Sequence, residues 1–390
     1  MNYLGYIENQ LKDLNGIHTA REIQQQPGIW LKIYDLIRKQ KEEIESFMKE
    51  ALRDADEIIL TGAGTSAFIG LSLSPVYKRN TGKCIQAIAT TDLVTHPKHY
   101  FNREKKVLLI SFARSGNSPE SCAAVDMAEK FSARARHLVI TCNAKGNLLG
   151  RCKKTDQFNV ILPEETNDKS LAMTSSFTGM LLAGLLINKI DNIDQEKQYV
   201  ENLAAYGKKI LTFYRDDLYN AAQKDFRRIV FLGSGPQMGT ATESHLKVQE
   251  LTDGKIIAKS DSFLGFRHGP KAVIDTSTLV VGLFSNDPYV LRYEYDLIKS
   301  LKKGQQPLYR IGIFESETIA ADFEKFIDLK IILSENNSSF VPEDYLSICN
   351  VLPAQMLGFF KSLERGLCPD NPSETGAISR VVEGVHIYSL

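Results

Sequence analysis

The 390-residue sequence predicts an α/β fold with two tandem domains, each a doubly wound parallel sheet flanked by helices, behind a helical N-terminal segment. Three observations predict this class. Short continuous apolar runs are typical of parallel strands buried on both faces, helical stretches separate the runs, and the pattern occurs twice. The predicted boundaries are 1–50 for the helical segment, 51–193 for the first domain, 194–220 for a helical linker, 221–365 for the second domain and 366–390 for a tail.

The predicted strands form two series with a constant spacing. The first series covers residues 57–60, 107–110, 137–140 and 158–162, and the second covers 228–232, 279–283, 309–313 and 330–333. When Gly62 is matched with Gly233 and Val107 with Leu279, the offsets are 171 and 172 residues, and the two later strands give 172 and 171. A constant offset over four strands predicts a duplicated domain.

The helices are predicted from apolar periodicity. An amphipathic stripe from Trp30 to Met48 predicts one long helix, and Thr19 with Glu22 has the spacing of a capping box at a helix start. Apolar helices are expected over 173–190 and 346–360, after the fourth strand of each series, and a hydrophilic helix over 194–214.

Composition excludes several classes of protein. Lys+Arg and Asp+Glu are both 47, and no basic run carries interleaved aromatic residues, so nucleic acid is not an expected partner. The N-terminus lacks the pattern of a signal peptide, and the longest apolar run, 179–187, is too short to span a bilayer. Six scattered cysteines without a CxxC pair indicate free thiols in the cytoplasm and no zinc site or other metal.

The loop 111–118 follows a predicted buried strand and resembles a phosphate cradle. It holds three serines, a glycine and an arginine, and Ser118 with Pro119 and Glu120 predicts the start of a helix. Free backbone N–H groups at such a start favour a small anion. The alternative is an ordinary capped helix start, because the same residue types dominate turns.

The second half has no such loop but offers groups for proton transfer. Its counterpart, 284–288, lacks the arginine and carries an acid that would repel phosphate. A helix over 239–252 places Glu243, Lys247 and Glu250 on one face, and His268 follows between glycine and proline turns. A partly buried Glu250 could act as a base next to a carbonyl, and His268 could exchange protons near pH 7. The alternatives are a surface ion pair and a solvated histidine.

Nucleotide-binding patterns are absent or incomplete. Gly62-Ala63-Gly64 begins like a dinucleotide fingerprint, but Ala67 stands where the third glycine belongs, and no acid follows the next strand region. The P-loop pattern does not occur, so neither a dinucleotide nor ATP is expected.

Taken together, these residues resemble the sugar isomerase (SIS) superfamily over nearly the whole chain. The resemblance rests on Gly-Ala-Gly-Thr-Ser at 62–66, the loop 111–118 and Phe-Arg-His-Gly-Pro at 266–270. Within the superfamily the chain is most similar to the bacterial branch of galactosamine-6-phosphate deaminases and tagatose-6-phosphate ketose/aldose isomerases. The distinctive stretches are 19–23, Gln26-Pro27, 163–166, 172–176 and 369–373.

The resemblance implies a role for each matching residue. It implies that Lys247 and Glu250 form the Lys-x-x-Glu pair in which the glutamate moves the proton, and that His268 opens the sugar ring, in relatives from the neighbouring subunit. Arg380 stands near the place of a C-terminal active-site lysine and is expected to bind charge. The residues implied to contact the substrate or its phosphate are Gly64, Thr65, Ser66, Arg114, Ser115 and Ser118; Ala113 replaces a common serine.

The resemblance also implies a reaction and an assembly. The expected reaction converts galactosamine 6-phosphate to tagatose 6-phosphate and ammonium through proton transfer from C2 to C1, with no cofactor. Two alternatives stay open: a tagatose-6-phosphate ketose/aldose isomerase without deamination, and a regulator that binds a sugar phosphate without converting it. The expected partners are the small sugar phosphate and at least one more copy of the chain, as a homodimer or a larger homo-oligomer.

Overall fold

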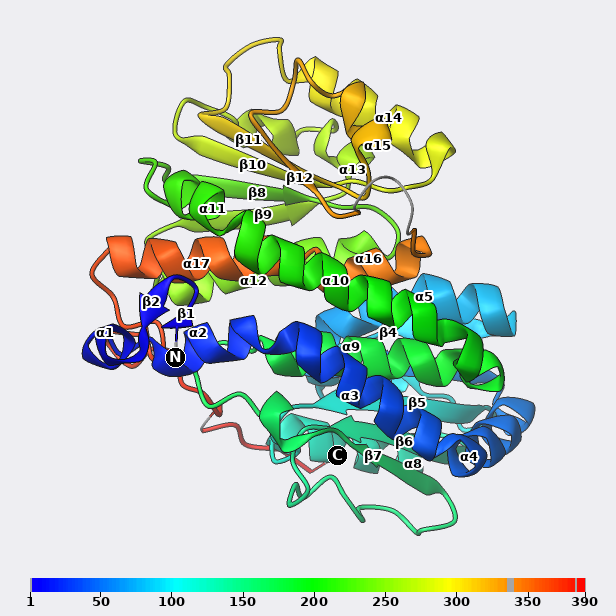
Figure 1. Ribbon diagram of the computed structural model, residues 1–390. Coiled ribbons are helices and arrows are strands. Elements are labelled where there is room, and N and C mark those ends of the chain that lie inside the picture. The colour runs from blue at the N-terminus through cyan, green and yellow to red at the C-terminus, as the bar shows by residue number, and fades with distance from the viewer. Residues whose placement is uncertain (1, 335–339, 383, 390) are drawn as a thin grey trace. The chain divides into compact units, whose positions relative to one another are not determined.

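The computed structural model describes residues 2–334, 340–382 and 384–389 and contains two five-stranded parallel sheets flanked by helices (Figure 1). The predicted α/β class is therefore confirmed. The first sheet has the order β4 (Cys84–Ala87), β3 (Glu57–Thr61), β5 (Lys106–Ala113), β6 (Arg134–Thr141) and β7 (Gln157–Ile161). The second has the order β9 (Ile257–Asp261), β8 (Arg228–Leu232), β10 (Thr278–Leu283), β11 (Tyr309–Phe314) and β12 (Leu329–Ile332). The two sheets therefore have the same strand order: second, first, third, fourth and fifth strand along the chain.

All eight predicted runs form strands, but the edge strands β4 and β9 were not among them. β9 pairs with a neighbour on one side only and ends on Lys259, Ser260 and Asp261, so it lacks the apolar run on which the prediction depended. Its first residue, Ile257, is 61% exposed. An edge strand that carries polar residues is ordinary protection against pairing with another chain.

The chain divides into two compact units. One comprises Gly28–Asp168, Ser175–Gln198 and Ile378–Leu390, and the other comprises Met1–Pro27, Lys169–Thr174 and Tyr199–Ala377. The first-sheet unit contains β3 to β7, and the second-sheet unit contains β8 to β12. The C-terminal segment from residue 378 therefore packs with the first-sheet unit, although it follows the second sheet in the sequence.

Helices cover both faces of the first sheet. α8 (Pro119–Phe131) packs on the face that carries Ile59, Val107 and Leu109, whereas α5 (Thr65–Thr81) and α9 (Ser175–Asn188) pack on the opposite face. Gly184 of α9 comes so close to Phe112 of β5 that a Cβ there would lie 3.1 Å from the ring. Figure 1 shows α9 on one side of this sheet and α8 on the other. Burial on both faces explains why the strands are continuously apolar.

The other helices complete the two units. In the first-sheet unit they are α3 (Gln26–Lys39), α4 (Lys41–Asp54), α6 (Thr90–Thr95) and α7 (Pro97–Tyr100). In the second-sheet unit they are α1 (Glu8–Asp13), α2 (Ile17–Gln24), α10 (Lys197–Phe213), α11 (Arg215–Ala222), α12 (Gln237–Leu251), α13 (Phe263–Phe266), α14 (Pro288–Ser300), α15 (Glu317–Ala321), α16 (Glu343–Cys349) and α17 (Leu352–Glu364). Strands β1 (Asn2–Tyr3) and β2 (Tyr6–Ile7) form a short antiparallel pair.

Two helices predicted as continuous are each divided in two. The stripe from Trp30 to Met48 belongs to α3 and α4, which meet at Gln40, where φ is −97° and ψ is 15°. The apolar segment 346–360 belongs to α16 and α17, and Pro353 lies in the first turn of α17. Proline fits there because the first turn of a helix needs no N–H donor, and the apolar periodicity continues across the break.

The predicted capping box at Thr19 and Glu22 is wrong, because α2 already begins at Ile17. Asp370 caps this helix instead: the backbone N–H groups of His18 and Thr19 donate to its carboxylate at 3.1 and 2.7 Å, and the Thr19 hydroxyl donates at 2.8 Å. Glu22 accepts from the backbone N–H of Lys169 at 2.5 Å. Both predicted cap residues therefore hold segments that are distant in the sequence.

Two further sequence expectations concern membranes and disulfides. None of the helices in the described part of the chain is long and apolar enough to cross a bilayer. All six cysteines are free thiols, as predicted; four of them are buried or half-buried.

Replacing Asp370 with alanine should lower the free energy of unfolding by about 1–2 kcal/mol, because it removes the carboxylate that accepts from two backbone N–H groups in the first turn of α2. Urea denaturation measures this change. The matched control is Asp296→Ala, which removes an exposed aspartate of α14. Equal effects of the two substitutions would contradict the capping role.

Candidate functional site

Two polar turns lie at the same edge of the first sheet. β3 and β5 are neighbouring parallel strands, and Thr61 at the end of β3 is in register with Ser111 near the end of β5. The turn 62–66 follows β3, and the residues 114–118 follow β5. Because parallel strands end at one edge, the fold brings both turns to the carboxyl edge of the sheet, where α/β proteins usually bind ligands.

The first turn depends on two glycines. A Cβ on Gly62 would lie 2.6 Å from the backbone of Ser66, so only glycine allows this close approach. Gly64 has φ +55°, after which α5 begins with Thr65 and Ser66, both buried. The two hydroxyl side chains therefore lie in the first turn of a long helix, whose N-terminus carries partial positive charge.

The second turn carries the predicted phosphate residues. The Arg114 guanidinium is buried and donates to the backbone carbonyl of Arg380 at 2.5 Å, and Ser115 Oγ accepts from the backbone N–H of Asn117 at 3.2 Å. Ser118 is the N-cap residue of α8, as predicted, but its hydroxyl donates to Ser121 Oγ at 2.7 Å and makes no cap hydrogen bond. The N-terminus of α8 is thus not covered by its own cap side chain, which suits an anion.

A neighbouring segment, Asn143 to Leu148, supports this turn from behind and was not predicted from the sequence. The Asn143 amide donates to the backbone carbonyl of Ser115 at 2.7 Å, and the Leu148 N–H donates to the carbonyl of Gly116 at 2.9 Å. A Cβ on Gly146 would lie 2.9 Å from the Ser115 carbonyl. We call residues 143–148 the bracing segment, since they fix the backbone that carries Arg114 and Ser115.

Two buried hydroxyls lie at this edge: that of Thr61, which was not predicted as a site residue, and that of Ser111, the first residue of the predicted loop 111–118. Thr61 Oγ1 and Ser111 Oγ have no hydrogen-bond partner among the described residues, although both side chains are buried. Buried hydroxyls are normally paired with protein, water or a ligand. The available signal was a hydroxyl residue at the end of an otherwise apolar strand.

Arg380 lies beside this turn, in the first-sheet unit. Its guanidinium donates to the backbone carbonyl of Asp168 at 2.8 and 2.6 Å and to Asn167 Oδ1 at 3.0 Å. The Asp168 carboxylate in turn accepts from the backbone N–H groups of Ser175 and Ser176 at the start of α9, at 3.1 and 2.9 Å. Arg380 thus holds the C-terminal segment against the turn that contains Arg114.

The second-sheet unit brings Lys247 together with two carboxylates. Lys247 Nζ lies 3.2 Å from Glu243 Oε1 and 2.5 Å from Glu250 Oε2. Burial alone would lower the pKa of Lys247, but the two carboxylates outweigh it and hold that pKa above its ordinary value. The side chains of Glu243 and Lys247 are 0% and 1% exposed, and that of Glu250 is 23% exposed. Glu250 is therefore the member of the cluster that solvent can reach, and the alternative of a surface ion pair is wrong for Lys247 and Glu243.

His268 stands apart from this cluster. It is exposed, and it lies between α13 and Gly269, whose φ of +120° only glycine adopts readily. No hydrogen bond or ion pair joins His268 to Glu250 in the described residues. The structure thus joins Lys247 to Glu250, whereas His268 makes no hydrogen bond or ion pair with either of them among the described residues.

In the second-sheet unit, carboxylates bind the backbone in and just after the segment 284–288, the counterpart of the loop 111–118. Asp287 caps α14 by accepting from the N–H groups of Tyr289 and Val290 at 2.7 and 3.3 Å. Glu294 accepts from the Ser285 N–H at 3.0 Å, and burial raises the pKa of Glu294 to about 8. Asp287, the acid noted in the sequence, therefore caps the N-terminus of α14. The corresponding helix after the first sheet's loop, α8, has no side-chain cap from its N-cap residue.

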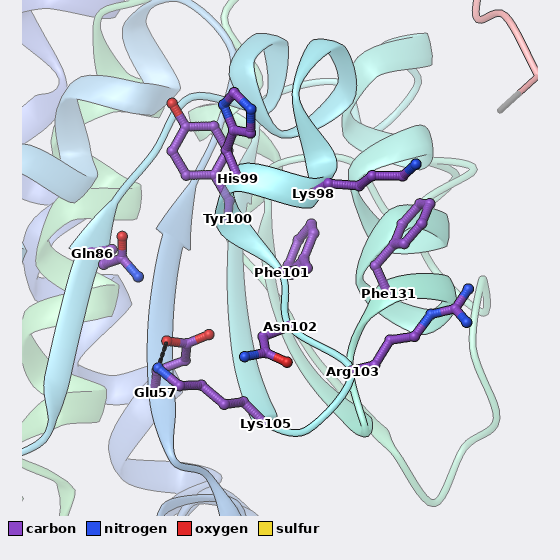
Figure 2. Close-up of a pocket in the computed structure, with 10 residues that line it drawn as sticks. All are labelled: Glu57, Gln86, Lys98, His99, Tyr100, Phe101, Asn102, Arg103, Lys105 and Phe131. Carbon is purple, nitrogen blue, oxygen red and sulfur yellow. Dashed lines mark hydrogen bonds and ion pairs between the residues drawn. The ribbon is translucent and has the colours of Figure 1, made fainter.

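A separate hollow of about 780 Å³ lies at the opposite, amino edge of the first sheet (Figure 2). Its lining includes Glu57, the first residue of β3, and Lys105, which precedes β5; the two form an ion pair at 3.2 Å. The remaining residues are Gln86, Lys98, His99, Tyr100, Phe101, Asn102, Arg103 and Phe131. The hollow contains none of the predicted site residues.

Comparisons with known proteins agree with the motifs. Residues 51–188 match the SIS domain family. The D-galactosamine-6-phosphate deaminase AgaS of Escherichia coli is 41% identical over 379 residues, covering 96% of this chain and 96% of the relative. The AgaS deaminase of Shewanella sp. (strain ANA-3) is 38% identical and covers 97% of this chain and 94% of the relative.

Solved structures are similar over 90% to 100% of the chain. The crystal structure of tagatose-6-phosphate ketose/aldose isomerase from Escherichia coli has a TM-score of 0.85 and 38% identity, covering 100% of this chain and 99% of that one. The C-terminal domain of glucosamine-fructose-6-phosphate aminotransferase from Francisella tularensis has a TM-score of 0.74 at 16% identity and shares the fold.

Replacing Glu294 with glutamine should flatten the pH dependence of stability. The folded state holds a proton on Glu294 up to pH about 8, whereas the unfolded state releases it near the ordinary value, so wild-type stability falls as pH rises between these values. Between pH 5 and pH 8 the wild type should lose about 2–4 kcal/mol more than the variant. Urea denaturation at both pH values measures the difference.

The control for this experiment is Glu317→Gln, which changes an exposed glutamate at the start of α15. It should leave the pH dependence of the wild type in place. If Glu294→Gln has the same pH dependence as the wild type, Glu294 is ionised in the folded protein.

Proposed function

Because this chain belongs to the AgaS family of SIS-domain proteins, we propose that it is an enzyme that converts galactosamine 6-phosphate to tagatose 6-phosphate and ammonium. The observation that carries the proposal is the 41% identity to a D-galactosamine-6-phosphate deaminase over 96% of both chains. The two hydroxyl-bearing turns at the carboxyl edge of the first sheet supply chemistry that suits the phosphate of such a substrate.

The phosphate ester is proposed to bind at these turns. Thr65 and Ser66 offer hydroxyls and backbone N–H groups in the first turn of α5, next to Gly64. Ser115 and Ser118 offer the same groups before α8. Two helix N-termini at one sheet edge favour a dianion, and the Arg114 guanidinium adds a fixed positive charge nearby. Ala113 contributes no hydroxyl, so the anion depends on the others.

The proton transfer is assigned to Glu250. Its carboxylate removes the C2 proton of the open-chain aldosamine, which gives an enolamine, and returns that proton to C1, while one proton of the C2 amino group passes to O1, which leaves a ketimine with a hydroxyl at C1. Water then adds to the ketimine, and hydrolysis yields the ketose 6-phosphate and ammonium. Lys247 is not the base, since its raised pKa keeps it protonated; its ammonium group pairs with Glu250 Oε2 at 2.5 Å.

His268 is proposed to assist opening of the sugar ring in the active site of a second copy of the chain. Its exposure, and the absence of a bond to Glu250 within the described residues, support a role across a subunit boundary. Arg380 is proposed to bind charge or position the C-terminal segment, because a guanidinium does not transfer protons near neutral pH. The proposed assembly is a homodimer or a larger homo-oligomer.

Residues 221–365 are proposed to form a second domain of the same kind as the matched one. Both sheets have the same strand order, and Gly235 repeats the φ of +55° found at Gly64, 171 residues earlier. A Cβ on Gly233 would lie 2.6 Å from the Gln237 carbonyl, as a Cβ on Gly62 would from Ser66. The shared turn geometry supports duplication.

A second candidate function is aldose–ketose isomerisation without loss of ammonia. The observation that favours it is the 0.85 TM-score to a structure named tagatose-6-phosphate ketose/aldose isomerase. With a hydroxyl at C2, the same proton transfer by Glu250 gives an isomerase. The group at C2 of the substrate therefore separates the two functions.

The deciding experiment measures ammonium release from galactosamine 6-phosphate, glucosamine 6-phosphate and tagatose 6-phosphate in parallel. Ammonium from the galacto compound alone is the expected result. Interconversion of tagatose 6-phosphate with its aldose, without ammonium, would make the protein an isomerase. No reaction with any of the three would contradict both functions.

Glu250→Gln and Ser115→Ala should change different kinetic constants, kcat and KM respectively. Glu250→Gln should lower kcat by about 10²–10⁴-fold with little change in KM, because it removes the group that carries the proton. Ser115→Ala should raise KM about 10-fold with little change in kcat, because it removes a hydrogen bond to a charged group. Steady-state kinetics of ammonium release measure both.

The control is Gln249→Ala, since Gln249 is the exposed neighbour of Glu250 on the same helix. It should leave both constants unchanged. An unaltered kcat in Glu250→Gln would remove Glu250 from the mechanism, and an unaltered KM in Ser115→Ala would remove the loop from the substrate site.

A further inference from the structure

Three residues with metal-binding side chains converge beside the bracing segment. Glu129 of α8, His137 of β6 and Cys152 each offer one ligand atom, and these atoms lie within 4.8 Å of one another. His137 Nε2 and Glu129 Oε1 are 2.7 Å apart. The three residues come from a helix, a strand and a loop, so the fold and not a sequence motif brings them together.

From this convergence of nitrogen, sulfur and oxygen donors, we propose that Glu129, His137 and Cys152 form a binding site for a zinc ion. Zinc in proteins takes imidazole, thiolate and carboxylate ligands in tetrahedral geometry, with water completing a three-residue set. Ligand atoms around a tetrahedral zinc lie about 3.3–3.8 Å apart, given bonds of about 2.0–2.3 Å. In the structure, His137 Nε2 and Glu129 Oε1 are 2.7 Å apart, and none of the three ligand atoms is more than 4.8 Å from another. The half-exposed Glu129 side chain can move to adjust these distances to the tetrahedral values.

The burial of these residues suits a zinc site in which His137 is held in place and the side next to Glu129 is open to solvent. His137 is fully buried, so its ring is held in place, whereas the Glu129 side chain is 49% exposed and leaves a path for the ion and a water. His137 Nδ1 is buried without a hydrogen-bond partner among the described residues. No second partner therefore fixes which ring nitrogen of His137 carries the proton.

The protons balance in a simple way. Without metal, His137 Nε2 and Glu129 Oε1 share a hydrogen bond at 2.7 Å, and the Cys152 thiol carries its proton. On binding, zinc displaces the thiol proton to solvent. His137 binds the ion through Nε2, so the bound imidazole carries its proton on Nδ1. No oxidant or reductant takes part.

The site has a structural consequence for the candidate phosphate loop. Cys152 follows the bracing segment by four residues, and its backbone N–H donates to Gln157 Oε1 at 3.0 Å. The Gln157 amide in turn donates to the carbonyl of Leu148, the last residue of the bracing segment, at 3.1 Å. An ion on Cys152 would therefore tie the segment that supports Ser115 to α8 and β6.

The test is metal binding by the full chain after removal of metal with a chelator. Cobalt is titrated first, because a thiolate ligand produces a sulfur-to-cobalt charge-transfer band, and zinc affinity is then measured against a chromophoric chelator. The wild type should bind one equivalent and show the band. Cys152→Ser should lose the band and bind zinc at least about 10-fold more weakly, and Glu129→Gln should weaken zinc while keeping the band.

Cys84→Ser is the matched control, since it removes an exposed thiol outside the cluster and should bind like the wild type. Zinc should also raise the thermal unfolding midpoint of the wild type and of Cys84→Ser, but not that of Cys152→Ser, because an ion that binds only the folded state stabilises it. The proposal is overturned if the wild type binds no zinc, if Cys152→Ser keeps the band, or if zinc leaves the wild-type midpoint unchanged. None of these readouts depends on the enzymatic activity.

Discussion

The parallel pairing of β3 with β5 is the constraint on which the candidate site depends. It puts Thr61 beside Ser111, so that the turn after each strand emerges at the same sheet edge. In a parallel sheet each strand is followed by a helix that returns to the other edge, so the N-termini of α5 and α8 also begin at this edge. Hydroxyls, backbone N–H groups and helix dipoles are thereby gathered in one place from two turns, 62–66 and 114–118, that are about 50 residues apart in the sequence.

The two sheets have the same strand order, but charged and polar side chains are placed differently at the helix that follows the second strand of each sheet's central pair. In the first, the N-cap residue Ser118 leaves the start of α8 without a side-chain cap, whereas in the second Asp287 covers the start of α14 with its own carboxylate. The second-sheet unit instead buries Lys247 between Glu243 and Glu250. A buried charge is tolerated only when it is paired, so Glu243 and Glu250 compensate Lys247, and the partial exposure of Glu250 separates it from an ordinary internal ion pair.

Local rules predicted the elements well where local forces decide them. The eight apolar runs became strands because burial on both faces requires a continuous apolar sequence, and Ser118 with Pro119 marked the start of α8. The rules failed where a distant residue supplies the interaction. Thr19 and Glu22 have the spacing of a cap, but Asp370 caps α2 and Glu22 binds the backbone near residue 170. Edge strand β9 was missed because an edge does not need an apolar sequence.

By itself the sequence determined the α/β class, the order of its strands along the chain, the polar loop at 111–118 and the pair of Lys247 and Glu250, because each depends on residue type and short spacing. Only the tertiary structure decided that Lys247 is buried, that no bond joins His268 to Glu250 in the described part of the chain, that residues 143–148 support the loop 111–118, and that Glu129, His137 and Cys152 converge. These facts depend on which distant segments pack together, and burial, charge compensation and ligand geometry are properties of that packing, which residue spacing does not encode.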